Sequence, residues 1–208
     1  MFHRMQPGRP HGQVGSEPSG PSGTTVRELG GGVRVITHPQ LTPTLESEMV
    51  GTWVEVTNRG GAGIGFLPPV SAQDVEPASA ELVKKVRNDA ARLVVVQRDS
   101  TLLGWLAVVL NRDHTQSHWA WLKRMHVIPE GRSAGIGTAM LDAAVDLCVA
   151  EGLRQLYLTT DGQTGPVGFY GKRGFVEVGR MPRNTLAADG NLHDEVYMMR
   201  EFEVADSS

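Results

Sequence analysis

The sequence lacks the features that are typical of disulfide-bonded, membrane-spanning and nucleic-acid-binding proteins. It holds one cysteine in 208 residues, so it can form neither an intrachain disulfide nor a CxxC metal site, and we expect a reduced, cytoplasmic setting. Its longest uncharged run, residues 60–73, is shorter than the roughly 18 apolar residues of a membrane helix. The net charge of −3 gives no basic field for nucleic acid. We therefore expect neither a membrane nor a nucleic-acid partner.

The first 32 residues hold few large apolar side chains. They contain eight glycines and four prolines, a composition that buries too little surface to offset the entropy of ordering the chain. No apolar stretch of the kind found in secretory signals follows the early arginines. We predict a disordered tail over residues 1–32 and one folded domain over residues 33–204.

From Val33 onward, apolar periodicity predicts alternating helices and strands. Strands are expected at 33–37, 93–97, 102–110, 119–128, 153–160, 175–181 and 193–202, and helices at about 43–60, 71–88, 135–151 and 166–172. The strands at 93–97 and 102–110 are predicted to form a hairpin. This order predicts a mixed α/β fold in which helices cover both faces of a central mixed sheet.

A glycine-rich turn leads into the helix predicted at 135–151. It reads Arg132-Ser-Ala-Gly135-Ile-Gly137-Thr138. Backbone N–H groups at a helix start lack intrahelical partners and the helix dipole is positive there, so a diphosphate can dock. The two glycines leave room for the phosphates, and the Arg132 and Thr138 side chains can add hydrogen bonds. The alternative is a tight turn whose glycines serve only helix packing.

Two nucleotide-binding motifs do not fit this turn. A Walker loop requires Lys after the second glycine, where Thr138 stands, and a Rossmann fingerprint requires a third glycine where Met140 stands. What remains is R-x-x-G-x-G, followed by Phe169-Tyr170-x-x-x-Gly174-Phe175.

With these two motifs, residues 33–203 resemble the GNAT acetyltransferase superfamily, whose signatures are [RQ]-x-x-G-x-[GA] and Y-x-x-x-G-F. Within it the sequence looks most like the tabtoxin resistance acetyltransferase type, through Gly60-Gly61-Ala62-x-x-Gly65-Phe66, Leu156-x-Leu158-x-Thr160, Val178-Gly179-x-x-Pro182 and Asp189-Gly190-x-Leu192-His193. The resemblance implies a mostly antiparallel sheet that splays between its fourth and fifth strands, at 119–128 and 153–160. It also implies acetyl-CoA as the acetyl donor, and homodimers are common among relatives.

Carried over residue by residue, the resemblance implies a donor site along the fourth strand and the turn after it. A bulge in this strand would leave a backbone N–H free to polarise the thioester carbonyl. Gln163 stands where many relatives have a cofactor-contacting Asn. The implied donor-binding residues are Met125, His126, Val127, Arg132, Ser133, Ala134, Gly135, Ile136, Gly137, Thr138, Gln163 and Tyr170.

Three residues are candidates for the chemistry. Tyr170 matches the family tyrosine that acts as general acid toward the departing thiolate, although a Tyr between Phe169 and Phe175 could simply be core. The look-alike has a carboxylate base where this chain has Thr159; Asp161, two residues on, could replace it or could cap a turn. His126 could also serve as the base, or it could be a buried histidine without a chemical role.

The acceptor is predicted to be a primary amine of a small molecule, such as an amino-acid-like metabolite, toxin or antibiotic. Candidate acceptor-facing residues are the 60–66 loop, Trp53, Glu195 and Tyr197, while Trp105, Trp119 and Trp121 are interpreted as sheet packing. Residues 184–192 could cover or line the acceptor side. Two alternatives stay open, a non-catalytic acetyl-CoA sensor and a protein or peptide N-acetyltransferase. The dispersed histidines give no metal site.

Overall fold

The computed structural model describes residues 23–59, 64–132 and 135–203. The part of the predicted tail before residue 23, together with Ser133, Ala134 and the tip of the 60–66 loop, lies outside these residues. Eight strands of the described chain form one sheet in the order β1-β2-β3-β4-β5-β6-β8-β7. Neighbouring strands are antiparallel except β5 and β6, which are parallel. The predicted mixed, mostly antiparallel α/β fold is therefore confirmed.

The elements lie close to their expected positions. The strands are β1 Thr25–Gly30, β2 Val33–Thr37, β3 Ala91–Arg98, β4 Thr101–Leu110, β5 Trp119–Val127, β6 Gln155–Asp161, β7 Val176–Leu186 and β8 Leu192–Glu201; the helices are α1 Pro43–Asn58, α2 Ala72–Arg87, α3 Ile136–Ala150 and α4 Val167–Gly171, with a 3-10 turn at Pro129–Gly131. Helix α2 continues through Pro77. Thr42 caps α1 by accepting from the Leu45 N–H, and Pro43 occupies the first turn, where a missing N–H costs little.

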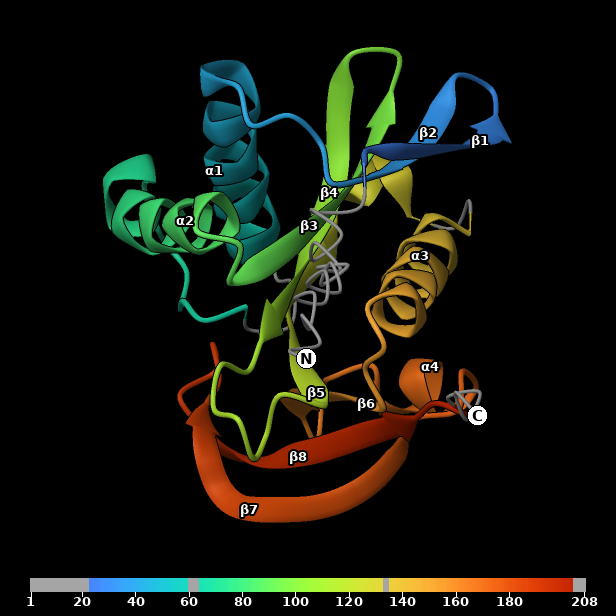
Figure 1. Cartoon of the computed structure of the whole chain (residues 1–208). Helices are drawn as coiled ribbons and strands as arrows, with labels where there is room; N and C mark the ends of the chain where they lie inside the picture. Colours follow the sequence, from blue (N-terminus) through green and yellow to red (C-terminus); the bar gives the residue numbers. More distant parts are fainter. Residues whose placement is uncertain (1–22, 60–63, 133–134, 204–208) are drawn as a thin grey trace, which may run out of the picture.

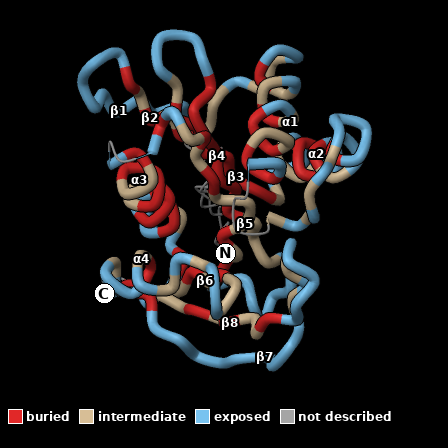
Figure 2. Tube along the Cα trace, turned by 180° about the vertical axis from the view of Figure 1, so that it is seen from behind, coloured by how far each residue is buried: buried red, intermediate tan, exposed pale blue. Residues whose placement is uncertain are grey.

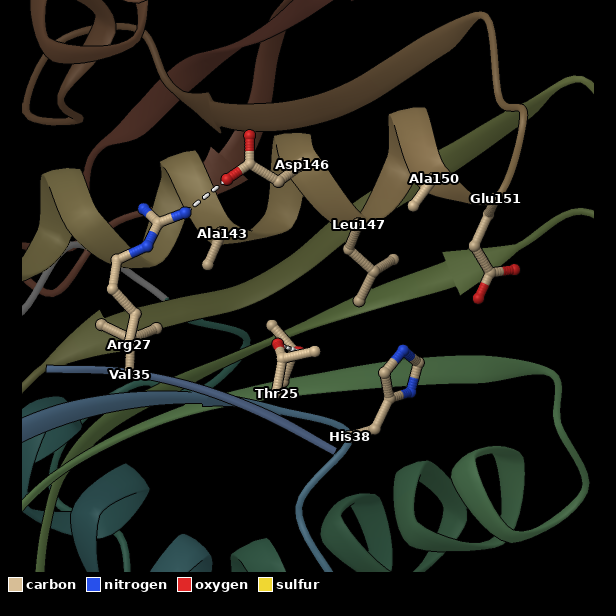
Figure 3. A pocket seen from close by; sticks show the side chains of 10 residues that line it. Thr25, Arg27, Val35, His38, Ala143, Asp146, Leu147, Ala150 and Glu151 are labelled. Carbon is tan, nitrogen blue, oxygen red and sulfur yellow. Dashed lines mark hydrogen bonds and ion pairs between the residues drawn. The ribbon is translucent and has the colours of Figure 1, made fainter. Parts of the chain in front are cut away.

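Strand β1 corrects the predicted domain boundary. Residues 25–30 belong to the region expected to be disordered, yet they pair antiparallel with β2. Every residue of β1 is exposed, so no apolar alternation marks it in the sequence. Backbone pairing to β2 and an ion pair from Arg27 to Asp146 of α3 hold the strand in place (Figure 3). The ordered sheet therefore begins at Thr25 rather than at residue 33.

Helices cover both faces of the sheet. Helices α1 and α2 lie on one face, and α3 and α4 lie on the other (Figure 1). Strand β3 is buried on both faces because Leu93 and Val95 join the α1/α2 core, whereas Val94 and Val96 join the α3 core. The centre of the sheet is buried, while β7 at its edge is exposed along nearly its whole length (Figure 2).

The sheet opens between β5 and β6. The two strands pair only where Trp119–Trp121 lies beside Gln155–Tyr157, and they diverge beyond that point. On its other side β5 carries a bulge, because the register with β4 shifts between the pairs Trp105–His126 and Ala107–Lys123. Arg124, within the bulge, has a φ of 59°. The bulge and the short pairing together produce the expected splay.

Candidate active site

A cleft of about 520 Å³ occupies the opening between β5 and β6. Its lining combines apolar side chains with cations, carboxylates and hydroxyls. The lining residues are Val56, Ile64, Gly65, Leu122, Lys123, Arg124, Met125, His126, Val127, Arg132, Leu158, Thr159, Thr160, Asp161, Pro166, Tyr170, Thr185 and Glu195. The structure thus brings Met125, His126, Val127, Arg132, Asp161 and Tyr170 of the predicted site to one cleft.

The first turn of α3 has no side-chain cap among the described residues. Its N-cap, Gly135, has a φ of 74° and makes no side-chain cap bond, and the first turn carries no acidic residue. A Cβ built at Gly135 meets no atom within 4 Å, and one at Gly137 meets nothing closer than 3.8 Å. These glycines therefore do not serve close helix packing. Gly135 supplies a left-handed backbone with open space beside it, as an anion site requires, whereas a Cβ at Gly137 would make ordinary contacts with Met125 and Phe169.

Arg173 is a cation at the same helix start that sequence reasoning missed. One of its Nη atoms donates to the Thr138 hydroxyl and the other to the Phe169 carbonyl, 3.1 Å away. Its guanidinium also stacks on the Phe169 ring, 4.1 Å from the centroid. The Thr138 hydroxyl is thus engaged within the protein. Arg173 directly precedes Gly174 of the Y-x-x-x-G-F motif. A single Arg in a turn is too common in proteins to indicate a functional cation from sequence.

Tyr170 is buried with its hydroxyl group directed at a sulfur atom. It comes from α4, packs edge-to-face against Phe169 and Phe175, and its hydroxyl lies 3.8 Å from the Met125 sulfur. Burial raises the pKa of Tyr170 to about 12. The phenol therefore stays protonated at neutral pH and can donate a hydrogen bond to a sulfur or a thiolate in the cleft.

Asp161 lies at the end of β6 on the same face as Thr159, opposite Glu195 of β8. One carboxylate oxygen accepts from the Gln163 and Thr164 N–H groups, each at 2.8 Å, and the other contacts His193 Nδ1 at 2.7 Å. Burial acts to raise the pKa of this carboxyl, but the hydrogen bonds outweigh burial and hold the pKa below its usual value. Asp161 therefore caps a turn and also orients His193, which sequence reasoning did not assign.

His126 lies in the interior on the α1 side of the sheet. Its ring packs on Trp105 at 4.8 Å, Nδ1 contacts the Arg124 carbonyl at 2.8 Å, and Nε2 contacts the Thr52 hydroxyl at 3.3 Å. Burial lowers the pKa of His126 to about 4. A neutral imidazole with both nitrogens engaged fits the buried-histidine interpretation better than that of a base.

Gln163 uses its side chain inside the fold. Its carbonyl oxygen accepts from the Asp194 N–H at 3.0 Å and so ties the turn after β6 to β8. Gln163 does not line the cleft described above. Its predicted contact with a cofactor stays a prediction.

A model of the acetyltransferase (GNAT) family matches residues 66–175. The chain belongs to this family. It is therefore an N-acyltransferase, and acetyltransferases of the GNAT family use acetyl-CoA as the acyl donor.

Solved structures share the GNAT fold at low identity. A GNAT acetyltransferase from Streptococcus pneumoniae has a TM-score of 0.64 at 18% identity, over 81% of this chain and 99% of that one. A ribosomal-protein-S5-alanine acetyltransferase from Vibrio fischeri has a TM-score of 0.67 at 13% identity, and the match covers 88% of this chain and 98% of that one. A chimeric spermidine N-acetyltransferase derived in part from Vibrio cholerae has a TM-score of 0.64 at 19% identity, and the match covers 82% of this chain and 95% of that one.

The far side of the GNAT cleft opens between two short segments. Gly65–Leu67 faces Asn184–Leu186 across a space of about 280 Å³, and Glu195 borders both this space and the cleft. Glu195 accepts from the Asn184 amide at 2.7 Å and the Tyr197 hydroxyl at 3.2 Å. The predicted 184–192 loop is thus the end of the β7–β8 hairpin, and it forms one wall of the opening.

Trp53 and Arg124 fix the other wall. Both donate to the Ile64 carbonyl, from Trp53 Nε1 at 3.1 Å and from an Arg124 Nη at 2.5 Å. A Cβ at Gly65 would overlap the present position of the Arg124 guanidinium, and the φ of 102° favours glycine there. Trp53 is buried and serves the core. Trp105 is also core, whereas Trp119 and Trp121 are half-buried and pack with Tyr157 and Tyr197.

A second pocket, of about 200 Å³, lies between β1–β2 and the C-terminal half of α3 (Figure 3). Leu147 and Val35 give it an apolar lining, and the Arg27–Asp146 pair borders it. It contains none of the predicted site residues. In the described ranges no helix is long and apolar enough to cross a bilayer. Within those same residues, no group of three His, Cys, Asp or Glu side chains is arranged to hold a metal.

Proposed function

We propose that this protein transfers the acetyl group of acetyl-CoA directly to a primary amine of a small molecule. The observation that carries the proposal is the protonated Tyr170 hydroxyl facing the cleft between an open helix start and the Glu195 carboxylate. An amino-acid-like metabolite, toxin or antibiotic, as in the tabtoxin resistance type, is an acceptor of this kind.

The donor substrate would lie along β5 and the start of α3. Backbone groups of Met125, His126 and Val127 are proposed to pair with the pantetheine arm, because this part of β5 is not paired with β6. The diphosphate would bind the turn from Arg132 through Ser133 and Ala134 to the N–H groups of Gly135, Ile136, Gly137 and Thr138. Arg173 would add positive charge beside Thr138.

The reaction needs a neutral amine, a polarised carbonyl and a proton for the leaving thiolate. The amine nitrogen bonds to the acetyl carbonyl carbon, the carbon–sulfur bond breaks, and Tyr170 donates its proton to the thiolate. The phenolate then regains a proton from solvent. The nitrogen loses one proton to a carboxylate at the acceptor side, which passes it to water. Charge and atoms balance without a further reactant.

Glu195 is the carboxylate that the geometry favours for the amine. It borders the cleft, and its polar contacts in the described structure are neutral donors. Asp161, the candidate from the sequence, keeps its place as a proposed base through its hydrogen bond with His193. Its three existing hydrogen bonds make it the weaker acceptor of a proton.

The small acceptor is supported by the modest size of the opening. About 280 Å³ between Gly65–Leu67 and Asn184–Leu186 accommodates a metabolite-sized molecule. Some structures of the same fold are named as ribosomal-protein-alanine acetyltransferases, so an exposed peptide α-amine is the second candidate.

The first test is binding and turnover. Calorimetry should detect acetyl-CoA binding, and an amine panel that includes short peptides should identify acceptors by release of CoA and formation of acetylated product. A chain that binds acetyl-CoA but releases no CoA with any amine would be a sensor module. A chain that does not bind acetyl-CoA would contradict the proposal altogether.

The second test is Tyr170→Phe. Loss of the proton donor should lower kcat by about 10²- to 10⁴-fold and leave the Kd for acetyl-CoA nearly unchanged. Tyr157→Phe is the matched control, because the Tyr157 hydroxyl contacts Gln155 outside the cleft. Equal rates for wild type and Tyr170→Phe would remove Tyr170 from the chemistry.

A further inference from the structure

Two cations stand at the acceptor side of the cleft without a carboxylate partner. Lys123 and Arg124 are consecutive residues of β5, both half-buried, and both line the cleft. Within the described residues, no Asp or Glu oxygen lies within 4 Å of a side-chain nitrogen of either residue. By contrast, the buried guanidinium of Arg92 is paired with Glu151.

Aromatic rings and a carbonyl hold the two cations instead. The Lys123 ammonium lies 4.3 Å from the Trp121 ring centroid, and the Arg124 guanidinium lies 4.9 Å from that of Trp53. Burial lowers the pKa of Lys123 and the neighbouring Arg124 lowers it further, whereas the Glu195 carboxylate raises it; burial also lowers the pKa of Arg124. The cleft therefore holds two partly desolvated cations that have no carboxylate in contact with them among the described residues.

Glu195 borders the same cleft and acts on the Lys123 charge without forming an ion-pair contact with it. Its carboxylate is held by the Asn184 amide and the Tyr197 hydroxyl. Arg124 lines the cleft and uses one Nη atom on the Ile64 carbonyl, and no other hydrogen bond from its guanidinium to a described residue is present. The acceptor side thus presents separated positive and negative groups.

We propose that the acceptor carries a carboxylate near its reactive amine, with Lys123 and Arg124 binding the carboxylate and Glu195 facing the amine. This rests on the proposed acetyltransferase function and narrows its substrate to an amino-acid-like zwitterion. A polyamine would meet two like charges here. A peptide N-terminus would offer only a neutral amide to the two cations.

The test compares acceptors that differ only at the anionic group. α-Amino acids, their α-carboxamides and spermidine are assayed with acetyl-CoA by CoA release, with kcat/KM corrected for the fraction of neutral amine. The wild type should favour at least one amino acid over its carboxamide by tenfold or more. Lys123→Gln and Arg124→Gln should each bring that ratio toward one, whereas Arg124→Lys should retain part of the preference.

Lys84→Gln, an exposed charge removed from α2, is the matched control and should leave the ratio unchanged. Thermal melting checks that the Arg124 variants fold, and Lys123→Gln tests the idea without disturbing the Ile64 contact. The wild type could bind acetyl-CoA but acetylate carboxamides, peptides or spermidine as well as or better than amino acids. That result would overturn the inference of a carboxylate-bearing acceptor and leave the proposed acetyltransferase function in place. Absence of acetyl-CoA binding would instead overturn the proposed function and this inference with it.

Discussion

Tyr170 and His126 show how the surroundings of a buried titratable side chain decide its use. Both are almost fully buried, and in both burial favours the neutral form. The Tyr170 hydroxyl has only the Met125 sulfur as a partner among the described residues, so it can turn to a ligand in the cleft. Both His126 nitrogens are engaged by the protein. Burial therefore keeps the Tyr170 hydroxyl protonated and able to donate a hydrogen bond into the cleft, whereas the neutral His126 ring is held by contacts within the protein.

The depressed pKa of His126 predicts acid sensitivity of the fold. Its pKa is about 4 in the folded protein and near 6.5 when unfolded, so the unfolded chain binds the extra proton between these values. Stability should be complete above pH 6.5 and should fall as the pH drops toward 4, by up to about 3 kcal/mol from this group.

Urea denaturation at pH 7 and pH 4.5 measures this effect. His126→Gln should lose much of the pH dependence, whereas His114→Gln, at an exposed position, should keep it. An unchanged slope in His126→Gln would assign the acid sensitivity to other groups.

At the scale of elements, one buried ion pair joins α3 to the sheet. Arg92 of β3 reaches Glu151, just after α3, with two nitrogens on two oxygens, one pair at 3.0 Å. It also contacts the Asp89 carboxylate at 2.7 Å. The Arg92 side chain is only 7% exposed. Because the start of α3 forms part of the proposed donor site, this pair helps to hold the helix that carries that site against the sheet.

Glu151→Gln should therefore lower the free energy of unfolding by about 2 kcal/mol. This is less than the ~3–5 kcal/mol for isolating a buried charge, since Asp89 still faces the guanidinium. Arg27→Gln is the comparison, because the Arg27–Asp146 pair is 50% and 63% exposed and should contribute less than about 1 kcal/mol. Equal losses in urea denaturation would show that burial does not distinguish the two pairs.

At the scale of the whole molecule, the sheet has two exposed edges, β1 and β7. Strand β7 carries exposed Val176, Val178 and Met181, and it contains Pro182, which cannot donate to a further strand. The homodimer expected from the family resemblance stays a prediction. Strand β1 covers the outer edge of β2, which would otherwise end the sheet.

A truncation series tests how much the outer strand contributes. A chain beginning at residue 23 should have the same melting temperature as the full chain, because it keeps every contact described for β1. A chain beginning at residue 31 should melt a few degrees lower, since each 1 kcal/mol corresponds to about 2–4 °C in a domain of this size. Equal melting temperatures for all three chains would show that β1 adds nothing to stability.

The sequence alone determined most elements and the glycine-led start of α3, because periodicity, caps and turn residues act over a few positions. Tyr170 came from the resemblance to a family motif, and its catalytic role stays a prediction. Pro43, the 135–151 periodicity and Gly135 are examples in which local chemistry and the observed structure agree. The same reasoning missed β1, which buries no side chain and so leaves no apolar pattern.

Only the tertiary structure decided which side chains meet across the sheet. Asp161 bonds His193 because β6 and β8 are neighbours, and Arg173 reaches Thr138 because α4 packs beside the start of α3. The same arrangement turns His126 into the core and leaves Lys123 and Arg124 without carboxylates. Such pairings depend on strand order and register between distant segments, and local sequence patterns do not contain that information.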